Sequence, residues 1–308
     1  MIYVCYIYMK RREFLKFVAI TTGTLAVLGT GSYFYLDNEK MRRAPKKQGK
    51  LIADLHTHPG RDHCIDEISN LLSWGITGLS HINENPNILT YDDILNLPNV
   101  TEIDKGLLAK IEYNGNKGYA AKTQEILSDH HILAVGCKEY IPSFEDARKV
   151  VEEIHKRGGK AILNHPYVIP TDSWPIKYRL INETEEKKVR ELADIVDEIE
   201  VHNAQNINLI PFIAWMKQAN EKAKDRLINE TEEKKVRELA DMLAKAYNKK
   251  GTASSDAHDE YEQIKICGIY VPEKNICIDA LKQYIATHNF ERYDNYVSRA
   301  SFLKGHFF

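Results

Sequence analysis

The chain has 308 residues, of which 43% are hydrophobic and 28% are charged, and its formal net charge is −2. This composition excludes a collagen-like, disordered or polytopic membrane protein and leaves enough apolar residues for one large core. Residues 1–50 hold ten of the 42 Lys and Arg but three of the 44 Asp and Glu, so they carry +7 and the rest of the chain carries −9. An acidic body argues against binding long nucleic acid and fits a protein that binds cations.

Residues 1–36 predict a signal for export. Residues 10–16 read Lys-Arg-Arg-Glu-Phe-Leu-Lys, and residues 17–36 follow without a charge. The pattern resembles a twin-arginine signal, and twenty helical residues reach across the ~30 Å apolar layer of a bilayer. We therefore expect a signal or membrane anchor that engages the twin-arginine translocation machinery and leads to an extracytoplasmic location. The basic residues of the predicted linker, 37–50, leave open an anchor whose body faces the cytoplasm.

From residue 51 onward, short apolar runs alternate with amphipathic segments, as in repeated β-α units. The pattern predicts helices over 66–74 and 144–156, and strands over 51–56, 76–80, 131–135, 160–163, 195–201 and 252–255. Because helices between strands allow parallel pairing, we expect an α/β barrel or a doubly wound sheet. Residues 276–308 predict a C-terminal helical extension.

Sixteen residues occur twice without a single change. Residues 179–194 and residues 226–241 both read RLINETEEKKVRELAD. Structural repeats diverge, so complete identity indicates a recent duplication or an assembly error. The first copy leads into the predicted strand 195–201, whereas the second interrupts a predicted helix over 220–247. We therefore interpret residues 226–241 as the inserted copy and expect it to lengthen that helix on the surface.

Two histidine-containing pairs after apolar runs indicate a metal site. The first is His56 and His58, and the second is Asp256 and His258. Residues two apart on an extended segment point to the same side, so both members of each pair reach one site. Asp54 precedes the first pair and is a candidate to orient one of its rings. Imidazole and carboxylate together suit Zn²⁺, Mn²⁺ or Fe²⁺.

Further histidines and acids lie near the ends of the other predicted strands. One of these residues taken alone is weak support for a metal site, because a single His is more often structural. Together they exceed the four to six ligands of one ion, so the set implies two or three divalent ions. The additional candidate ligands are Asp62, His63, His81, Glu125, His131 and His165.

These motifs resemble those of the polymerase-and-histidinol-phosphatase (PHP) family over about residues 51–275. The opening motif of the family appears as Asp54-Leu-His56-Thr-His58, and its closing motif as Ser255-Asp256-Ala-His258. The motifs between them correspond, in chain order, to His81, Glu125, His131 and the His165-Pro166 pair.

The sequence departs from the family pattern at several places, among them Gln124, where glycine is usual, and the residues after His165-Pro166, which lack the arginine of some nucleotide-cleaving members. An acid expected five residues after the second His falls on His63, beside Asp62, and Ser80 replaces the acid before His81. The resemblance implies a distorted (β/α)7 TIM-like barrel with two or three metal ions at the carboxyl ends of its strands. It also implies hydrolysis of a phosphoester by a metal-bridging hydroxide, with no side-chain nucleophile.

The acidic body favours a small phosphorylated molecule or a nucleotide over long nucleic acid as substrate. Arg61 and Lys138 are the nearest basic candidates for binding phosphate, and His202 is a candidate substrate contact. Two alternatives stay open. One is an amidohydrolase-like enzyme that cleaves a C–N or lactone bond, and the other is a non-catalytic metal-binding module.

Overall fold

The computed structural model describes residues 43–83, 85–170, 178–204, 230–258 and 263–295. The predicted signal over residues 1–36 lies outside these ranges, as do residues 220–229 of the predicted helix and the last residues of the C-terminal extension. Within the described ranges, no helix combines the length and the apolar character needed to span a membrane.

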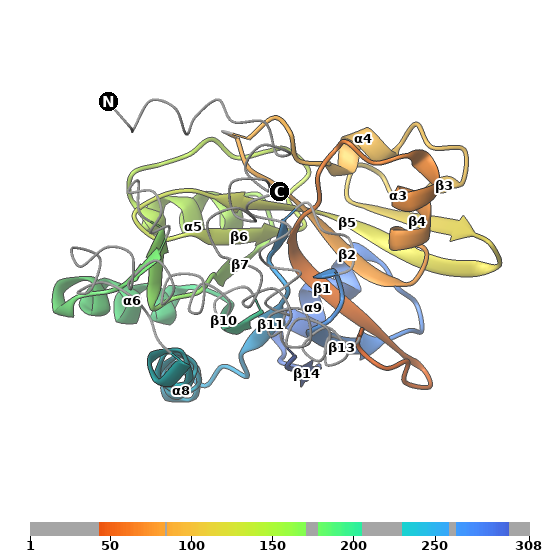
Figure 1. The fold of residues 1–308 in the computed structure, drawn as a ribbon. Helices are drawn as coiled ribbons and strands as arrows, with labels where there is room; N and C mark the ends of the chain where they lie inside the picture. The colour runs from red at the N-terminus through yellow and green to blue at the C-terminus, as the bar shows by residue number, and fades with distance from the viewer. Residues whose placement is uncertain (1–42, 84, 171–177, 205–229, 259–262, 296–308) are drawn as a thin grey trace, which may run out of the picture.

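The described residues form a mixed α/β fold whose main sheet of twelve strands curves into a nearly closed barrel (Figure 1). Its order is β11-β10-β7-β6-β5-β2-β1-β13-β14, with β12 beside β1 and the ribbon of β3 and β4 beside β5. The sheet nearly closes because β11 also lies against β1 and β13. Its strands are β1 (Lys50–His58), β2 (Gly75–His81), β3 (Val100–Asp104), β4 (Leu108–Tyr113), β5 (Asn116–Ile126), β6 (Ile132–Val135), β7 (Lys160–Leu163), β10 (Glu198–Asn203), β11 (Thr252–Ser254), β12 (Ala257–His258), β13 (Gly268–Pro272) and β14 (Glu291–Tyr293).

Helices cover the barrel on its outside, and a short two-stranded sheet of β8 (Val168–Pro170) and β9 (Tyr178–Leu180) lies apart from it. In Figure 1, α5, α6 and α8 lie on the left, and α3 with β3 and β4 lies on the right. The helices are α3 (Ile65–Leu72), α4 (Tyr91–Ile94), α5 (Ala147–Lys156), α6 (Glu183–Ile195), α8 (Glu230–Ala246) and α9 (Ile278–Ala286).

Apolar side chains pack between these helices and the sheet. Val150 of α5 and Leu192 of α6 meet Ile199 of β10 in one buried cluster. In another cluster, Leu281 of α9 packs with Leu55 of β1. Helix α9 therefore belongs to the same core as the barrel strands, and burial of these faces is the main stabilising contribution to the fold.

The predicted strands and helices of the barrel are confirmed with small shifts in their ends, and β7 has the predicted bounds. The expected parallel pairing holds for β1 with β2, β2 with β5 and β7 with β10, but β6 is antiparallel to both β5 and β7, and β13 is antiparallel to β1. Only residues 127–131 connect β5 to β6. A parallel crossover needs a dozen or more residues, so this short connection forces the chain to turn back.

The second copy of the repeated segment supplies residues 230–241 of α8, and α8 packs against β10. Val236 and Ala240 of this copy are buried in the same cluster as Val189 and Ala193, their counterparts in α6. A helix whose apolar face is buried does more than extend a surface helix. Both copies therefore contribute to the hydrophobic core of the barrel.

Candidate metal centre

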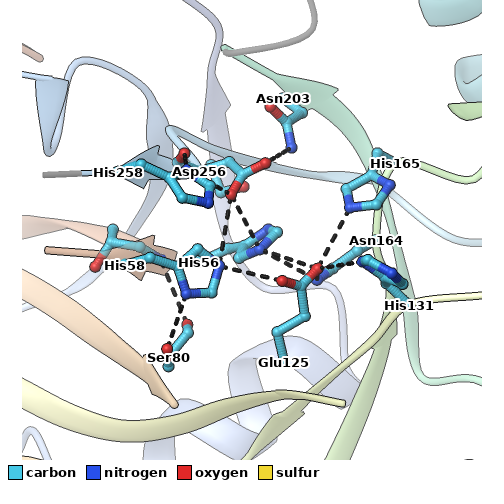
Figure 2. A network of polar contacts seen from close by, with 12 residues as sticks. His56, His58, Ser80, Glu125, His131, Asn164, His165, Asn203, Asp256 and His258 are labelled. Carbon is cyan, nitrogen blue, oxygen red and sulfur yellow. Dashed lines mark hydrogen bonds and ion pairs between the residues drawn. The ribbon is translucent and has the colours of Figure 1, made fainter. Parts of the chain in front are cut away.

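The carboxyl ends of the central strands bring together seven of the predicted ligands (Figure 2). His56 and His58 lie at the end of β1, and Glu125 lies near the end of β5. His131 directly precedes β6, whose antiparallel direction places its first residues at this rim. The remaining members are His165, which follows β7, and Asp256 and His258, which follow β11.

The seven residues form three overlapping groups in which the ligand atoms lie within 4.8 Å of one another. His58 belongs to two of the groups, and so does Glu125. Overlap of this kind suits a site for more than one ion, because a carboxylate with two oxygens can bridge neighbouring ions. The groups are His56, His58 and Glu125; His58, Asp256 and His258; and Glu125, His131 and His165.

The spacing between ligand atoms matches that around a small cation. His56 Nε2 lies 3.4 Å from both Glu125 Oε1 and Asp256 Oδ1. His58 Nε2 lies 3.2 Å from Glu125 Oε2 and 3.5 Å from Asp256 Oδ1. Two tetrahedral ligands at about 2.1 Å from a zinc ion lie ~3.4 Å apart. These four side chains therefore fit a divalent ion between them.

The hydrogen bonds on the outer side of each ring show which nitrogen faces the centre. His58 Nδ1 lies 2.9 Å from the carbonyl oxygen of Ser80, and His165 Nδ1 lies 3.1 Å from that of Val168. His258 Nδ1 likewise lies 2.8 Å from the carbonyl oxygen of Asp256. A carbonyl oxygen can only accept, so each Nδ1 carries the hydrogen and each Nε2 lone pair is available to a metal ion.

This arrangement leaves lone pairs facing carboxylates. His58 Nε2 and Asp256 Oδ1 are buried without a hydrogen-bond partner among the described residues, although they lie only 3.5 Å apart. Two lone pairs at this distance repel each other unless a cation or an additional proton lies between them. The donor set therefore fits divalent metal ions, and protons take their place when no metal is bound.

The electrostatics of the cluster follow from burial and close opposite charges. Burial alone would lower the pKa of His56, but Asp256, Glu125 and Glu200 together raise that pKa well above its ordinary value. Burial would raise the pKa of Glu125, but its contacts with His56 and His131 hold the pKa well below the usual range. The pKa of Asp256 is lowered as well, against the effect of its burial, mainly by His56 and His258. The three groups thus favour an ionised, cation-binding centre.

Several residues of the site were not predicted from the sequence. Glu200 is buried in the middle of β10, where Oε1 accepts from His56 Nδ1 at 3.0 Å and Oε2 accepts from the backbone N–H of His165 at 3.0 Å. Asn203 donates to both Glu200 and Asp256, at 3.1 and 3.0 Å. Asn164 donates to Glu125 at 3.2 Å. A carboxylate flanked by Ile199 and Val201 is the sequence signal that could have identified Glu200, because a buried charge needs partners.

The role expected for Asp54 is wrong, because Glu200 and not Asp54 orients the ring of His56. Asp54 accepts hydrogen bonds from the backbone N–H of Ser255 at 3.0 Å and from that of Lys265 at 2.8 Å. Complete burial raises the pKa of Asp54 to about 6. Asp54 therefore ties β1 to the segments that precede β12 and β13 instead of contacting an imidazole.

Three predicted ligands are absent from the three groups of the described chain. Asp62 is exposed, and His63 Nδ1 lies 3.3 Å from Glu67 of α3. The loop that carries them is held by another segment, because the backbone N–H of Arg61 donates to the carbonyl oxygen of Asn87. The ring of His81 packs against Tyr140 at 4.3 Å between centroids. The Ser80 hydroxyl of β2 donates to the carbonyl oxygen of Leu55 and lies within hydrogen-bond distance of the Thr123 hydroxyl. Because side chains alternate along a strand, His81 faces the opposite side of the sheet from Ser80.

Two of the three predicted substrate contacts, Arg61 and His202, have other partners in the described chain. Arg61 donates to Asp93 at 2.9 and 3.1 Å. Lys138 is exposed at the surface. His202 is buried, and its Nε2 lies 2.5 Å from the carbonyl oxygen of Asn295. Burial lowers the pKa of His202.

No protein-family model matches the chain, and no curated protein matches it. Solved structures similar to it include PsfC from Pseudomonas syringae PB-5123, with a TM-score of 0.46 and 13% identity over 84% of this chain and 97% of that one. Another is the lesion-specific endonuclease PfuEndoQ from Pyrococcus furiosus, with a TM-score of 0.43 and 14% identity over 79% of this chain and 57% of that one. Similarity at this level assigns no function to the chain.

Proposed function

We propose that this chain is a metal-dependent phosphoesterase of the PHP type that hydrolyses a small phosphorylated molecule or a nucleotide. The observation that carries the proposal is the set of imidazole Nε2 atoms directed at Glu125 and Asp256 inside the barrel rim. A site with shared carboxylates and several neutral imidazoles suits two or three Mn²⁺, Zn²⁺ or Fe²⁺ ions.

Such ions, when bound, lower the pKa of bound water toward ~7 and neutralise charge on the phosphoryl oxygens. The residues of the chain hold the ligands in place. Glu200 keeps the proton of His56 on Nδ1, and the carbonyl oxygen of Ser80 does the same for His58. Asn203 fixes one oxygen of Asp256 and leaves the other directed into the cluster. These side chains are buried, so their charges are screened less than charges at the surface.

The backbone at two ligands supports a functional role for this rim. His165 has a φ of 27° and Asp256 a φ of 49°, so both occupy the left-handed region that non-glycine residues rarely adopt. Strain of this kind persists where surrounding structure imposes it and clusters at functional sites. Both residues thereby direct their side chains toward Glu125 and His56.

We also propose that residues 1–36 export the chain or anchor it to a membrane by the twin-arginine route. The paired arginines and the uncharged stretch over 17–36 support this proposal. Fractionation of cells that lack the twin-arginine machinery tests it, and an unchanged extracytoplasmic location would contradict it.

Elemental analysis of the purified full chain, combined with a panel of phosphoesters, tests the proposed activity. We expect two or three ions per chain in the wild type, loss of ions and of hydrolysis in His56→Ala/His58→Ala, and loss of at least one ion in His131→Ala. The matched variants His81→Ala and His155→Ala should keep the metal content, because neither side chain lies in the three ligand groups of the described chain. No bound metal after reloading would overturn the proposal, and full metal content with hydrolysis of amides instead of phosphoesters would change the reaction class.

A further inference from the structure

A pocket of ≈ 310 Å³ lies at the amino ends of three parallel strands. Lys50 is the first residue of β1, Gly75 is the first of β2, and Lys117 is the second of β5, and all three line the pocket. His58 lies at the other end of β1, roughly 26 Å away at about 3.3 Å per residue. The pocket is therefore remote from the candidate metal centre.

Four lysines line this cavity, which we call the lysine pocket: Lys46, Lys47, Lys50 and Lys117. Lys47 and Lys50 share one carboxylate, that of Glu291, and the Lys50 ammonium lies 3.0 Å from it. Lys117 lies 3.8 Å from Glu273, and Lys46 has no ion-pair partner among the described residues. Four ammonium groups thus face two carboxylates.

This excess of positive charge stands out because the chain after residue 50 carries a formal charge of −9. Ammonium groups gathered around one cavity repel one another, and the repulsion is relieved when an anion enters. Salt bridges between exposed groups contribute little, so Glu273 offsets only part of this charge. The lysine pocket therefore has the electrostatics of an anion site.

The segment that carries three of these lysines is held against the barrel. The backbone N–H of Ala44 donates to Lys265 at 2.8 Å, and the buried Tyr270 hydroxyl donates to the carbonyl oxygen of Pro45 at 2.5 Å. The Lys47 ammonium lies 4.3 Å over the ring of Tyr270. Residues 44–50 were predicted to belong to a linker, but these contacts fix them in place. A fixed frame loses less entropy on binding a ligand than a loose linker does.

We propose that the lysine pocket binds a phosphate group, either of a soluble phosphate or of an anionic lipid headgroup. Lysine ammonium groups bind phosphate oxygens as point charges, without the fixed geometry of arginine. Trp74 and Tyr270 add aromatic wall to the cavity, which suits the glycerol part of a headgroup. The proposal does not rest on the hydrolase activity, because it uses none of the metal-centre residues.

Equilibrium dialysis of the full chain against radiolabelled inorganic phosphate, in an uncharged detergent, tests the pocket. The test variant is Lys46→Gln/Lys50→Gln/Lys117→Gln. The matched control, Lys105→Gln/Lys187→Gln/Lys245→Gln, removes the same charge from exposed positions elsewhere. We expect phosphate to bind at least about tenfold more weakly to the test variant than to the control. Both variants keep the metal centre and any phosphate that binds there. A difference in phosphate binding between the two variants is therefore due to the lysine pocket.

Competition with short-chain lipids separates the two sources. If dihexanoyl phosphatidylglycerol displaces phosphate at a lower concentration than unlabelled phosphate does, and dihexanoyl phosphatidylcholine does not, the pocket is a lipid-headgroup site. If unlabelled phosphate competes better than either lipid, it is a site for a soluble phosphate. Equal phosphate binding by the test and control variants overturns the proposal, and so does the absence of binding to the wild type at millimolar phosphate.

Discussion

Four of the five histidines of the metal centre are held by an acceptor on the side away from the cluster, and these acceptors decide what the rings can bind. Three of them are backbone carbonyl oxygens, whereas His56 depends on a side chain, Glu200. Glu200 also accepts from the backbone N–H of His165 and from Ser254. A single carboxylate thus links β7, β10, β11 and the end of β1.

The substitution Glu200→Gln tests this positioning role. Glutamine keeps the size of the side chain but removes the charge that holds the His56 proton on Nδ1, so we expect metal affinity to fall by about 10–100-fold. Titration with Zn²⁺ in competition with a chelating dye measures the change. The exposed Glu152→Gln variant is the matched control and should bind metal as the wild type does. Wild-type affinity in Glu200→Gln would remove Glu200 from the positioning of the site.

The two copies of the repeated segment show how one sequence serves two helices. Val189 in α6 and Val236 in α8 occupy the same position of the repeat, and both are buried in one hydrophobic cluster. An amphipathic helix finds a place wherever its apolar face can be covered. The barrel accepts the second copy because β10 offers such a surface.

Val189→Ala and Val236→Ala form a pair of variants that test the contribution of each copy. Each change removes apolar volume from the same cluster, so we expect each to lower the free energy of unfolding by about 1–3 kcal/mol. Urea denaturation followed by circular dichroism gives these values. Lys187→Ala, on the exposed face of the first copy, should change the free energy of unfolding by less than about 0.5 kcal/mol. An effect of Val236→Ala as small as that of Lys187→Ala would show that the second copy is dispensable.

At the scale of the whole molecule, the barrel separates two kinds of charge. Carboxylates and imidazoles meet at the carboxyl ends of the strands, whereas lysines surround the cavity at the amino ends. The buried cluster joins strands from distant parts of the chain, so its protonation or metal content affects the stability of the entire barrel.

The stability that metal ions provide should depend on pH. His56 and His165 have raised pKa values, so in the metal-free chain their contribution is fully present below their ordinary pKa of 6.5 and is lost as pH rises through the folded value. Glu125 has a lowered pKa, so its contribution is present above 4.5 and is lost as pH falls through the folded value. At a pH above the folded pKa values of His56 and His165, a bound metal ion supplies the positive charge that the deprotonated rings have lost.

Thermal unfolding with and without Zn²⁺ or Mn²⁺ measures this effect. We expect the rise in Tm on metal addition to be larger at pH 8 than at pH 6, because protons compete with metal for the cluster at the lower pH. The His56→Ala/His58→Ala variant serves as the control and should show little rise at either pH. An equal rise at both pH values would mean that the imidazoles are not the metal ligands.

The sequence by itself determined six strands of the barrel and seven of the residues that meet at the rim, but not β3, β4 and β5. The ends of strands can be predicted because apolar runs stop there. Side chains two residues apart on a strand point to the same side, so the sequence alone pairs His56 with His58 and Asp256 with His258. The large excess of His and acid at such ends predicts a site with many ligands from the sequence alone.

Only the tertiary structure decided the remaining features, because they depend on register and on distant partners. The pairing of β2 with β1 and β5 places Ser80 in contact with both strands and His81 on the opposite side. Contacts between residues more than 100 positions apart placed Glu200 behind His56, and no local pattern encodes such a contact. The antiparallel direction of β6 followed from a connection too short for a parallel crossover. Burial of a side chain and the partner that it meets are properties of the packed molecule, and they separated the residues that form the centre from those that only resemble ligands.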